Sequence, residues 1–419
     1  MILFKDKDQL CSSDLQFGFK EKVSTTDCTF TLKETIKYYN CNKSNVYVLM
    51  LDATKAFDRV RYCKLFKLLL RRNVNPLVLR LLLHMYTKQE LQVLWGNVCS
   101  KVFSACNGVK QGGVLSPVLF AVYMDELLMR LKKTGIGCHI GASFLGALAY
   151  ADDLTLLCPT LKSLGMLVRI CEIFSDEYDV LFNGPKSQFL IFQGRDCIVE
   201  LDTCISVNGR DVPRRDSADH LGHKISSVSD DSLVESAVHS FWRGFNLFMS
   251  EFGHLNGFVK CRLFMRYCCS YYGAPLWSLY SSGFESLCVA WRKALRSIWG
   301  IPCNTHCDIV AALSNCVPLE LNIKSRFLRF ATKCNDHKNS VVREVFNVAK
   351  KNPMSPFCRN MKNTMAMNEM YAKWYERQNE IIDDVNVIRE LIDVREGMKN
   401  INYMNHEDIL FIIESLCTT

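Results

Sequence analysis

The sequence predicts an α+β domain built on an antiparallel sheet, followed by a region that contains only helices. Up to about residue 225, short apolar runs bounded by turn residues alternate with helical patterns, and hairpin turns favour antiparallel pairing. From residue 226 onward only helical patterns remain. The chain has 419 residues, and two or three subdomains of roughly 100 to 200 residues are therefore expected.

The strands of the predicted sheet all lie in the first half of the chain. Val46–Leu51 is a short apolar run with β-branched residues, which predicts a buried strand that ends at Asp52. Two apolar runs on either side of a polar turn predict a β-hairpin with Asp152 and Asp153 at its tip. The later runs and an Asn-Gly hairpin turn lie at residues 144–149, 154–158, 188–192 and 208–209. Helices are expected to cover one face of this sheet.

Apolar residues at helical spacing predict the helices. One helix opens with Asn75 as N-cap and Pro76 at its first position, and another begins at Ser116-Pro117. The helices predicted in the sheet domain span residues 62–72, 76–86, 116–134 and 161–178. Those predicted after it span 232–252, 259–272, 284–299, 319–348 with a possible break, 368–378 and 383–398. A helical subdomain is therefore expected to follow the sheet domain.

Composition and charge narrow the class of protein without identifying it. The 51 Lys and Arg exceed the 43 Asp and Glu by 8, which suits a polyanionic partner, although many proteins without one are equally basic. The 21 Cys form no disulfide framework and are expected to be reduced thiols. No signal peptide is evident, and no apolar run approaches the ~20 residues that cross a bilayer. A nuclear or cytoplasmic protein without a membrane partner is expected.

Asp52, Asp152 and Asp153 are expected at one edge of the sheet. Placed together, three carboxylates repel one another unless divalent cations neutralise them. Mg2+ binds carboxylate and phosphate oxygens, so this cluster suits two-metal phosphoryl transfer. For each feature alone, ordinary turn or strand-end chemistry is the commoner explanation. Further motifs must therefore decide between the two.

Five ordered sequence blocks favour the functional interpretation. The first three, which resemble motifs A, B and C of reverse transcriptases, are Leu51–Asp58, Asn107–Pro117 and Tyr150–Asp153. Phe182-Asn183 with Lys186 resembles motif D, and His220–Ile225 resembles motif E, the primer grip. The residues of these blocks are similar to those of LINE-type (non-LTR) retrotransposons rather than to those of retroviral enzymes. The segment Gln16–Phe19 with Ser24-Thr25 matches what precedes motif A there, so the resemblance extends from residue 14 to about 225.

This resemblance implies an RNA-directed DNA polymerase with the right-hand polymerase fold. Asp52 and Asp152 would hold two Mg2+ ions, or Mn2+ in their place, and Asp153 would complete the site. Phe57 would be the steric gate, because a bulky ring against the sugar leaves no room for a 2′-hydroxyl and selects dNTPs. An RNA template, a DNA primer and dNTPs are the implied partners. The oligomeric state is not implied.

The resemblance also suggests which residues surround the incoming nucleotide. Gln111 would lie beside it, on a loop where Gly112 lets the backbone approach the base pair, and Ala53 belongs to the same group. Lys110 would either meet the triphosphate or be solvated. Lys186 is a candidate general acid for the leaving pyrophosphate, although a plain surface lysine is the commoner situation.

The resemblance names the expected subdomains as well. They are a fingers remnant at 1–45, a palm at 46–225 with a helical fingers insertion at about 59–105, a helical thumb at 226–350 and a helical tail at 351–419. Compared with full-length elements, the sequence begins after the endonuclease and after the fingers block that clamps the triphosphate. We expect the loss of that clamp to weaken nucleotide binding.

Other functions remain open from the sequence. The chain would alternatively be an inactive nucleic-acid-binding remnant of a truncated element, or another palm polymerase such as an intron maturase or a viral RNA polymerase. Phe57 and the Ala-Asp-Asp tip argue against the viral enzyme. The helix segment Trp291–Arg296 carries three cations, which suits phosphate contact or an ordinary exterior. Chance clustering explains Cys303, His306, Cys307 and Cys316 better than a zinc site, because the paired halves of zinc motifs are missing.

Overall fold

The structure, a computed structural model, describes residues 6, 8–199, 204–229 and 232–364. The helices predicted at 368–378 and 383–398 lie outside these residues. The chain separates into two compact units. The sheet unit comprises Met1–Val228 with Cys334–Ser355, and the helical unit comprises Ser229–Lys333 with the described residues after 355. The mixed α+β fold class predicted from the sequence is confirmed.

A four-stranded antiparallel sheet forms the centre of the sheet unit, with strand order β12-β1-β10-β9. Its strands are β1 (Val46–Leu51), β9 (Ala147–Tyr150), β10 (Asp153–Cys158) and β12 (Gln188–Phe192). In the register of β1 with β10, Leu51 pairs with Leu154. The residue after β1 and the first residue of β10 therefore meet at the same edge of the sheet.

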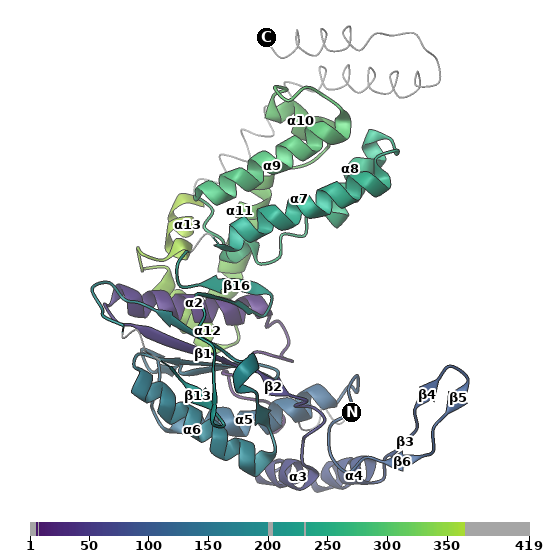
Figure 1. The fold of residues 1–419 in the computed structure, drawn as a ribbon, viewed down its shortest axis with the longest axis vertical. Helices are drawn as coiled ribbons and strands as arrows, with labels where there is room; N and C mark the ends of the chain where they lie inside the picture. Colours follow the sequence, from purple (N-terminus) through teal and green to yellow (C-terminus); the bar gives the residue numbers. More distant parts are fainter. Residues whose placement is uncertain (1–5, 7, 200–203, 230–231, 365–419) are drawn as a thin grey trace. The chain divides into compact units, whose positions relative to one another are not determined.

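Helices cover both faces of this sheet, which corrects the expectation of a single covered face. Figure 1 shows α2 (Thr25–Cys41) over one face, and α5 (Ser116–Lys133) with α6 (Leu161–Tyr178) over the other. Every residue of β10 from Leu154 to Cys158 is buried. A strand buried on both faces reads as a continuous apolar run instead of an alternating one, which is the pattern here.

The predicted helices at the start of the chain are present, and their caps follow the sequence. The Asn75 side chain accepts a hydrogen bond from the Leu77 amide at 2.9 Å, at the start of α4. The helices are α3 (Tyr62–Arg71) and α4 (Pro76–Thr87).

In the described part of the chain, short strands form six further antiparallel pairs. They are β2 (Ala53–Thr54) with β11 (Leu181–Phe182), β3 (Glu90–Leu91) with β6 (Phe103–Ser104), β4 (Leu94–Trp95) with β5 (Val98–Cys99), β7 (His139–Ile140) with β8 (Ser143–Phe144), β13 (Ser206–Val207) with β14 (Arg210–Asp211), and β15 (Ser217–His220) with β16 (His223–Ser226). The short 3-10 helix η1 (Gly184–Lys186) precedes β12.

One segment from late in the sequence belongs to the sheet unit. The helix α12 (Ser340–Ala349) packs against α2 and buries an apolar face that includes Val341, Val345 and Phe346. The helical subdomain expected at 226–350 includes this segment, whereas in the structure the segment belongs to the sheet unit. The boundary differs because a break after α11 lets an apolar helix return to the sheet unit, which the spacing of residues along the chain does not reveal.

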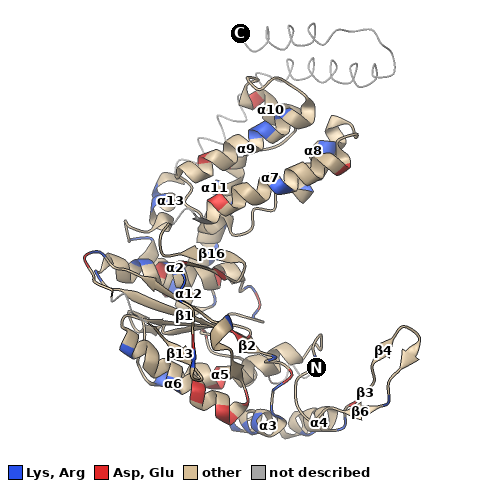
Figure 2. Cartoon of the chain, viewed as in Figure 1, with Lys and Arg blue, Asp and Glu red and all other residues tan. Residues whose placement is uncertain are grey.

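The helical unit is built around aromatic side chains. Phe264 contacts Phe241, Phe245 and Phe248, with ring centroids 5.8 to 6.2 Å apart. Its elements are α7 (Ser232–Phe252), α8 (Gly257–Tyr267), η2 (Ala274–Leu276), α9 (Ser282–Trp299), α10 (Cys307–Leu313), α11 (Leu319–Asn335) up to Lys333, and α13 (Pro356–Thr364). In residues 232–333 and 356–364, thirteen Lys and Arg stand against five Asp and Glu, and Figure 2 shows cations on α7, α8 and α9.

The described residues bear on membrane-spanning helices and on the state of the cysteines. Among them, no helix combines the length and the apolar character needed to cross a membrane. All of their cysteines are free thiols.

Candidate active site

The structure brings Asp52, Asp152 and Asp153 to the same sheet edge. Asp52 follows β1, whereas Asp152 lies in the β9–β10 turn and Asp153 begins β10. Partial burial raises the pKa of Asp152, its backbone hydrogen bond opposes this, and the charge of Asp52 raises the pKa further. Partial burial, followed by the charges of Asp152 and Asp52, raises the pKa of Asp153. The carboxylates therefore repel one another across the edge.

These carboxylates suit divalent cations, although they do not form a closed cage. Among the described residues, His306, Cys307 and Asp308 are the only group of at least three His, Cys, Asp or Glu whose ligand atoms all lie within 4.8 Å of one another. The three aspartates are therefore spread more widely. Mg2+ keeps several water or phosphate ligands and needs only one or two carboxylates from a protein. The raised pKa values of Asp152 and Asp153 reflect burial first and neighbouring negative charge second, and a bound cation would offset both.

The segment that resembles motif D holds the backbone of Asp52. The Asp52 amide donates to Ser187 Oγ at 3.1 Å, and the Asn183 amide donates to the Asp52 carbonyl at 2.9 Å. Ser187 Oγ in turn donates to the Asn183 carbonyl at 2.7 Å. Ala53 pairs with Phe182 in the two-stranded ladder of β2 and β11. Lys186 is exposed on η1, between Asn183 and Ser187, which make these hydrogen bonds.

Phe57 is held between two other aromatic rings. It stacks on Phe120 of α5 with centroids 4.2 Å apart and an interplanar angle of 14°. Phe19 meets it edge-on, with centroids 6.2 Å apart and an angle of 89°. Phe57 is half-buried, so part of the residue remains accessible. The position of the Phe57 ring is therefore fixed by packing against Phe19 on one side and Phe120 on the other.

The glycine-rich loop begins beside Phe57. The Gly108 amide donates to the Val60 carbonyl at 2.9 Å, and the Val109 amide donates to the Phe57 carbonyl at 2.8 Å. Gly108 has φ +90°, and a Cβ there would lie 2.8 Å from the Asp58 carbonyl oxygen. Only glycine permits this approach. Beyond Val109 the three predicted nucleotide-contacting residues, Lys110, Gln111 and Gly112, are exposed.

The two histidines that resemble motif E are structural. His220 and His223 are buried in the β15–β16 hairpin, and His220 Nδ1 lies 2.9 Å from Thr29 Oγ1. Burial lowers the pKa of His220 to about 3, with a smaller effect of His223. Burial lowers the pKa of His223 to about 4, and the charge of Lys33 adds to this. Both side chains are therefore neutral at physiological pH.

The cysteine and histidine residues near 303–316 do not form one cluster. His306 and Cys307 lie close to Asp308, and the Asp308 amide donates to His306 Nδ1 at 3.3 Å. Cys316 is buried, and its thiol donates to the Ser314 carbonyl at 3.1 Å.

Sequence reasoning assigned no role to two residues that hold this site, Gln16 and Ser187. Gln16 is completely buried, and its amide is hydrogen-bonded to both backbone groups of Ala151, in the aspartate turn. A signal for Gln16 was present, because it opens the block that matches LINE-type elements. Ser187 had no sequence signal, since a serine beside a strand is common.

An acidic hairpin turn, a strand-end aspartate, a packed aromatic ring and a glycine-rich loop meet in this unit. The family model described as reverse transcriptase (RNA-dependent DNA polymerase) matches residues 4–225, which is more than half of the chain. The chain therefore belongs to the reverse transcriptase family. Within it, the relatives are Pol proteins of non-LTR retrotransposons.

Three curated proteins illustrate this relation. The R2 retrotransposon Pol polyprotein of Nasonia vitripennis is 35% identical over 139 residues, which are 32% of this chain and 13% of that protein. The R2DM Pol polyprotein of Drosophila melanogaster is 28% identical over 213 residues, 49% of this chain and 20% of that protein. The transposon TX1 149 kDa protein of Xenopus laevis is 26% identical over 169 residues, 39% of this chain and 13% of that protein. The chain thus matches a fifth or less of the length of these relatives.

Solved structures show a more distant likeness. Apo telomerase from Candida tropicalis superposes with a TM-score of 0.41 at 12% identity, covering 89% of this chain and 59% of that one. Telomerase from Candida albicans with a telomeric RNA fragment gives 0.37 at 15% identity, covering 83% and 55%.

Proposed function

We propose that this chain is an RNA-directed DNA polymerase that extends a DNA primer on an RNA template, as in target-primed retrotransposition. The observation that carries the proposal is the meeting of Asp52 with Asp152 and Asp153 at one sheet edge, where their charges act on one another. In this proposal the sheet unit is the palm, with α3 and α4 as a fingers insertion, and the helical unit is the thumb.

Asp52, Asp152 and Asp153 would hold two divalent ions, Mg2+ or Mn2+. Such ions, when bound, make the primer 3′-hydroxyl a better nucleophile and neutralise the leaving pyrophosphate. The contribution of the chain is to hold the carboxylates in place before substrate arrives, which lowers the cost of reorganisation during the reaction. The hydrogen bonds of Ser187 and Asn183 to the Asp52 backbone serve this purpose.

Phe57 would select the sugar of the incoming nucleotide. A ring that is packed against Phe120 and Phe19 cannot move aside easily to admit a 2′-hydroxyl. Deoxynucleotides need no such movement. The geometry therefore supports synthesis of DNA by steric exclusion of ribonucleotides.

The exposed residues around the site would contact the nucleotide. Gln111 and Gly112 would meet the nascent base pair, with Ala53 at the same edge, and Lys110 would approach the triphosphate. Lys186, on the segment that clamps Asp52, would protonate the leaving pyrophosphate. The surplus of cations in the helical unit would hold the template–primer duplex through its phosphates, within a nuclear or cytoplasmic ribonucleoprotein.

Primer extension on an RNA template tests this function. We expect incorporation of dNTPs but not rNTPs, dependence on Mg2+ and its loss in EDTA. Asp152→Asn should lower incorporation by about 100- to 1000-fold, the range seen when electrostatic catalytic groups are removed. Asp176→Asn, an exposed aspartate on α6, is the matched control and should retain wild-type activity.

Two results would contradict the proposal. Absence of dNTP incorporation above the Asp152→Asn level would leave an inactive nucleic-acid-binding remnant, provided that RNA binding persists. Equal use of dNTPs and rNTPs would exclude the role of Phe57.

A further inference from the structure

The loop Leu15–Phe19 lies along the outer edge of the hairpin that carries the aspartates. β9 is the edge strand of the sheet, and Gln16 forms a parallel bridge with Ala149 of that strand. The Phe17 amide donates to the Ala149 carbonyl at 2.7 Å, and the Ala149 amide donates to the Leu15 carbonyl at 2.9 Å. The loop therefore continues the sheet beyond β9, although more than 130 residues separate the two segments in sequence.

The Gln16 side chain closes on the turn itself. Its Nε2 donates to the Ala151 carbonyl at 3.1 Å, and its Oε1 accepts from the Ala151 amide at 2.9 Å. Oε1 also accepts from the Gly18 amide at 2.9 Å. Ala151 has φ +59°, a left-handed conformation that a residue with a side chain adopts only at a cost. One buried amide thus satisfies both backbone groups of the strained residue directly before Asp152.

Two further residues of this loop extend the contact. A Cβ on Gly18 would lie 2.5 Å from the Ala151 backbone nitrogen, so the loop and the turn are as close as backbone allows. The Phe19 ring then meets Phe57 edge-on. A single short loop therefore touches both the aspartate turn and the ring proposed as the sugar gate.

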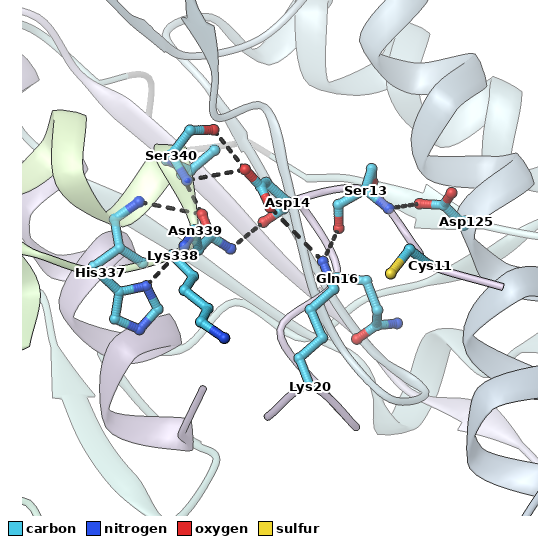
Figure 3. Close-up of polar contacts among 12 residues, drawn as sticks. Cys11, Ser13, Asp14, Gln16, Lys20, Asp125, His337, Lys338, Asn339 and Ser340 are labelled. Carbon is cyan, nitrogen blue, oxygen red and sulfur yellow. Dashed lines mark hydrogen bonds and ion pairs between the residues drawn. The ribbon is translucent and has the colours of Figure 1, made fainter. Parts of the chain in front are cut away.

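The start of the loop is anchored to other elements of the sheet unit. The Ser13 amide donates to Asp125 Oδ1 of α5 at 2.8 Å, and Arg72 pairs with the other oxygen of that carboxylate at 2.6 Å. Figure 3 shows Asn339 and Ser340, at the beginning of α12, bonded to Asp14: the Asn339 amide side chain reaches the Asp14 carbonyl at 2.7 Å and the Ser340 amide reaches its Oδ2 at 2.9 Å. The loop is thus fixed independently of the hairpin.

We propose that the loop Leu15–Phe19 positions the aspartate turn and the Phe57 ring relative to one another, with Gln16 as the positioning residue. Gln16 bonds the backbone of Ala151, directly before Asp152, and in this proposal it acts through that contact. Because catalytic groups lose most of their effect when displaced by about 1 Å, a shift of this turn would cost activity. The proposal rests on the proposed polymerase function.

Gly18→Ala is the sharpest test, because it adds one methyl group that must displace Ala151. The matched control is Gly165→Ala on α6, where an added Cβ meets nothing within 4 Å. We expect Gly18→Ala to lower kcat for dNTP incorporation by roughly 10- to 100-fold, with little change in KM for the primer–template. Gly165→Ala should leave both unchanged. Gln16→Leu, which removes both hydrogen-bonding groups that meet Ala151, should resemble Gly18→Ala.

A readout that needs no activity separates this proposal from the polymerase function. Hydrogen exchange of the Ala151 amide should be slow in the wild type and about tenfold faster in Gln16→Leu, which removes the Oε1 acceptor of that amide, since RT ln 10 corresponds to the net value of one hydrogen bond. Mn2+ binding, measured by electron paramagnetic resonance, should weaken in Gly18→Ala. If the wild type incorporates no dNTP while these two shifts occur, the polymerase function fails and the positioning role stands.

Phe19→Leu keeps the proposal testable if the loop variants do not fold, because Phe19 is exposed by 45% and contributes little to the core. We expect this change to reduce the preference for dNTPs over rNTPs several-fold. Wild-type kcat and Mn2+ affinity in Gly18→Ala, together with wild-type Ala151 exchange in Gln16→Leu, would overturn the proposal. So would an unchanged nucleotide preference in Phe19→Leu.

Discussion

The aspartate turn and the glycine-rich loop are two halves of one candidate site, and they are supported very differently. Around the turn, Gln16 bonds both backbone groups of Ala151, and Ser187 with Asn183 bonds the backbone of Asp52. In the loop, the Val109 amide bonds the Phe57 carbonyl and the Gly113 amide bonds the Lys110 carbonyl within the loop itself, while Lys110 to Gly112 are exposed. The carboxylates are thus held in advance, whereas the residues proposed to face the nucleotide lie on an exposed loop.

This difference fits the roles proposed for the two regions, metal binding at the aspartate turn and nucleotide binding at the glycine-rich loop. A metal site gains from rigid supporting contacts, because misplaced ligands bind and act poorly. A loop that receives four different nucleotides and then releases the product gains from weaker local stability. Substitutions at the turn should therefore change catalysis, and substitutions at the loop should change nucleotide affinity.

The largest effect that follows from this contrast is expected for Asp52→Asn. Loss of the carboxylate should lower single-turnover dNTP incorporation by about 100- to 1000-fold. Thermal unfolding should be unchanged or shifted slightly upward, because the substitution relieves repulsion with Asp152 and Asp153. Activity within tenfold of the wild type would show that Asp52 is not a metal ligand.

Arg72→Leu should have the largest effect on stability. It leaves Asp125, which is 3% exposed, as a buried charge without its cation, and this typically costs about 3 to 5 kcal/mol. Urea unfolding would measure the loss. The control is Arg169→Leu, since the Arg169 side chain is 76% exposed in its pair with Glu172 and should contribute no more than about 1 kcal/mol. Equal effects of the two changes would mean that the anchor of the loop Leu15–Phe19 is not important for stability.

Much of the sheet and its edge could be predicted from the sequence because local signals were strong there. Val46–Leu51 and Gln188–Phe192 are strands with the predicted bounds, and Leu161–Tyr178 is a helix with the predicted bounds. The convergence of Asp52 with the aspartate turn followed from strand ends and a hairpin tip. These features depend on neighbouring residues, which a sequence displays directly.

The helix α2 was missed because tertiary burial, not local pattern, stabilises it. Thr29, Thr31 and Thr35 are β-branched and weaken helix propensity, and burial around most of the helix removes the usual apolar stripe. One local signal was overlooked. Ser24 and Asp27 form a capping box, in which the Ser24 amide donates to Asp27 Oδ2 at 2.6 Å.

The support of the site could not be predicted, because it joins segments that are distant in sequence. The bond from Gln16 to Ala151 spans 135 residues, and that from Asn339 to Asp14 spans 325. A glutamine or an asparagine in a loop has no periodicity that marks it as buried. Family resemblance located the block that contains Gln16, but only the structure shows what its amide contacts.

A pH titration tests the burial of the two histidines in the β15–β16 hairpin. His220 and His223 remain neutral in the folded chain down to about pH 3 and 4, whereas in the unfolded chain they bind protons below about pH 6.5. The free energy of unfolding should therefore be constant with respect to these groups above pH 6.5 and fall as the pH decreases from 6.5 toward 4. The slope should reach about 1 kcal/mol per pH unit for each histidine.

Urea unfolding between pH 7.5 and 5.5 would measure this slope. His220→Gln should reduce it, and His254→Gln, at an exposed position, should leave it unchanged. A slope that is independent of His220 would mean that this side chain titrates normally in the folded state and that the hairpin against α2 is open to water.

The smallest effect is expected at the exposed loop, with Gln111→Ala. An exposed side chain without a stabilising role should not change thermal unfolding, because surface substitutions usually stay within about 0.5 kcal/mol. Loss of a contact with the nucleotide should raise KM for dNTPs by about tenfold, equivalent to about 1.4 kcal/mol, with a smaller change in kcat. The opposite pattern, with kcat lowered and KM unchanged, would place Gln111 among the residues that act on the transition state. The contrast between a prearranged turn and a substrate-ordered loop would then be wrong, because both halves of the site would act in the same step.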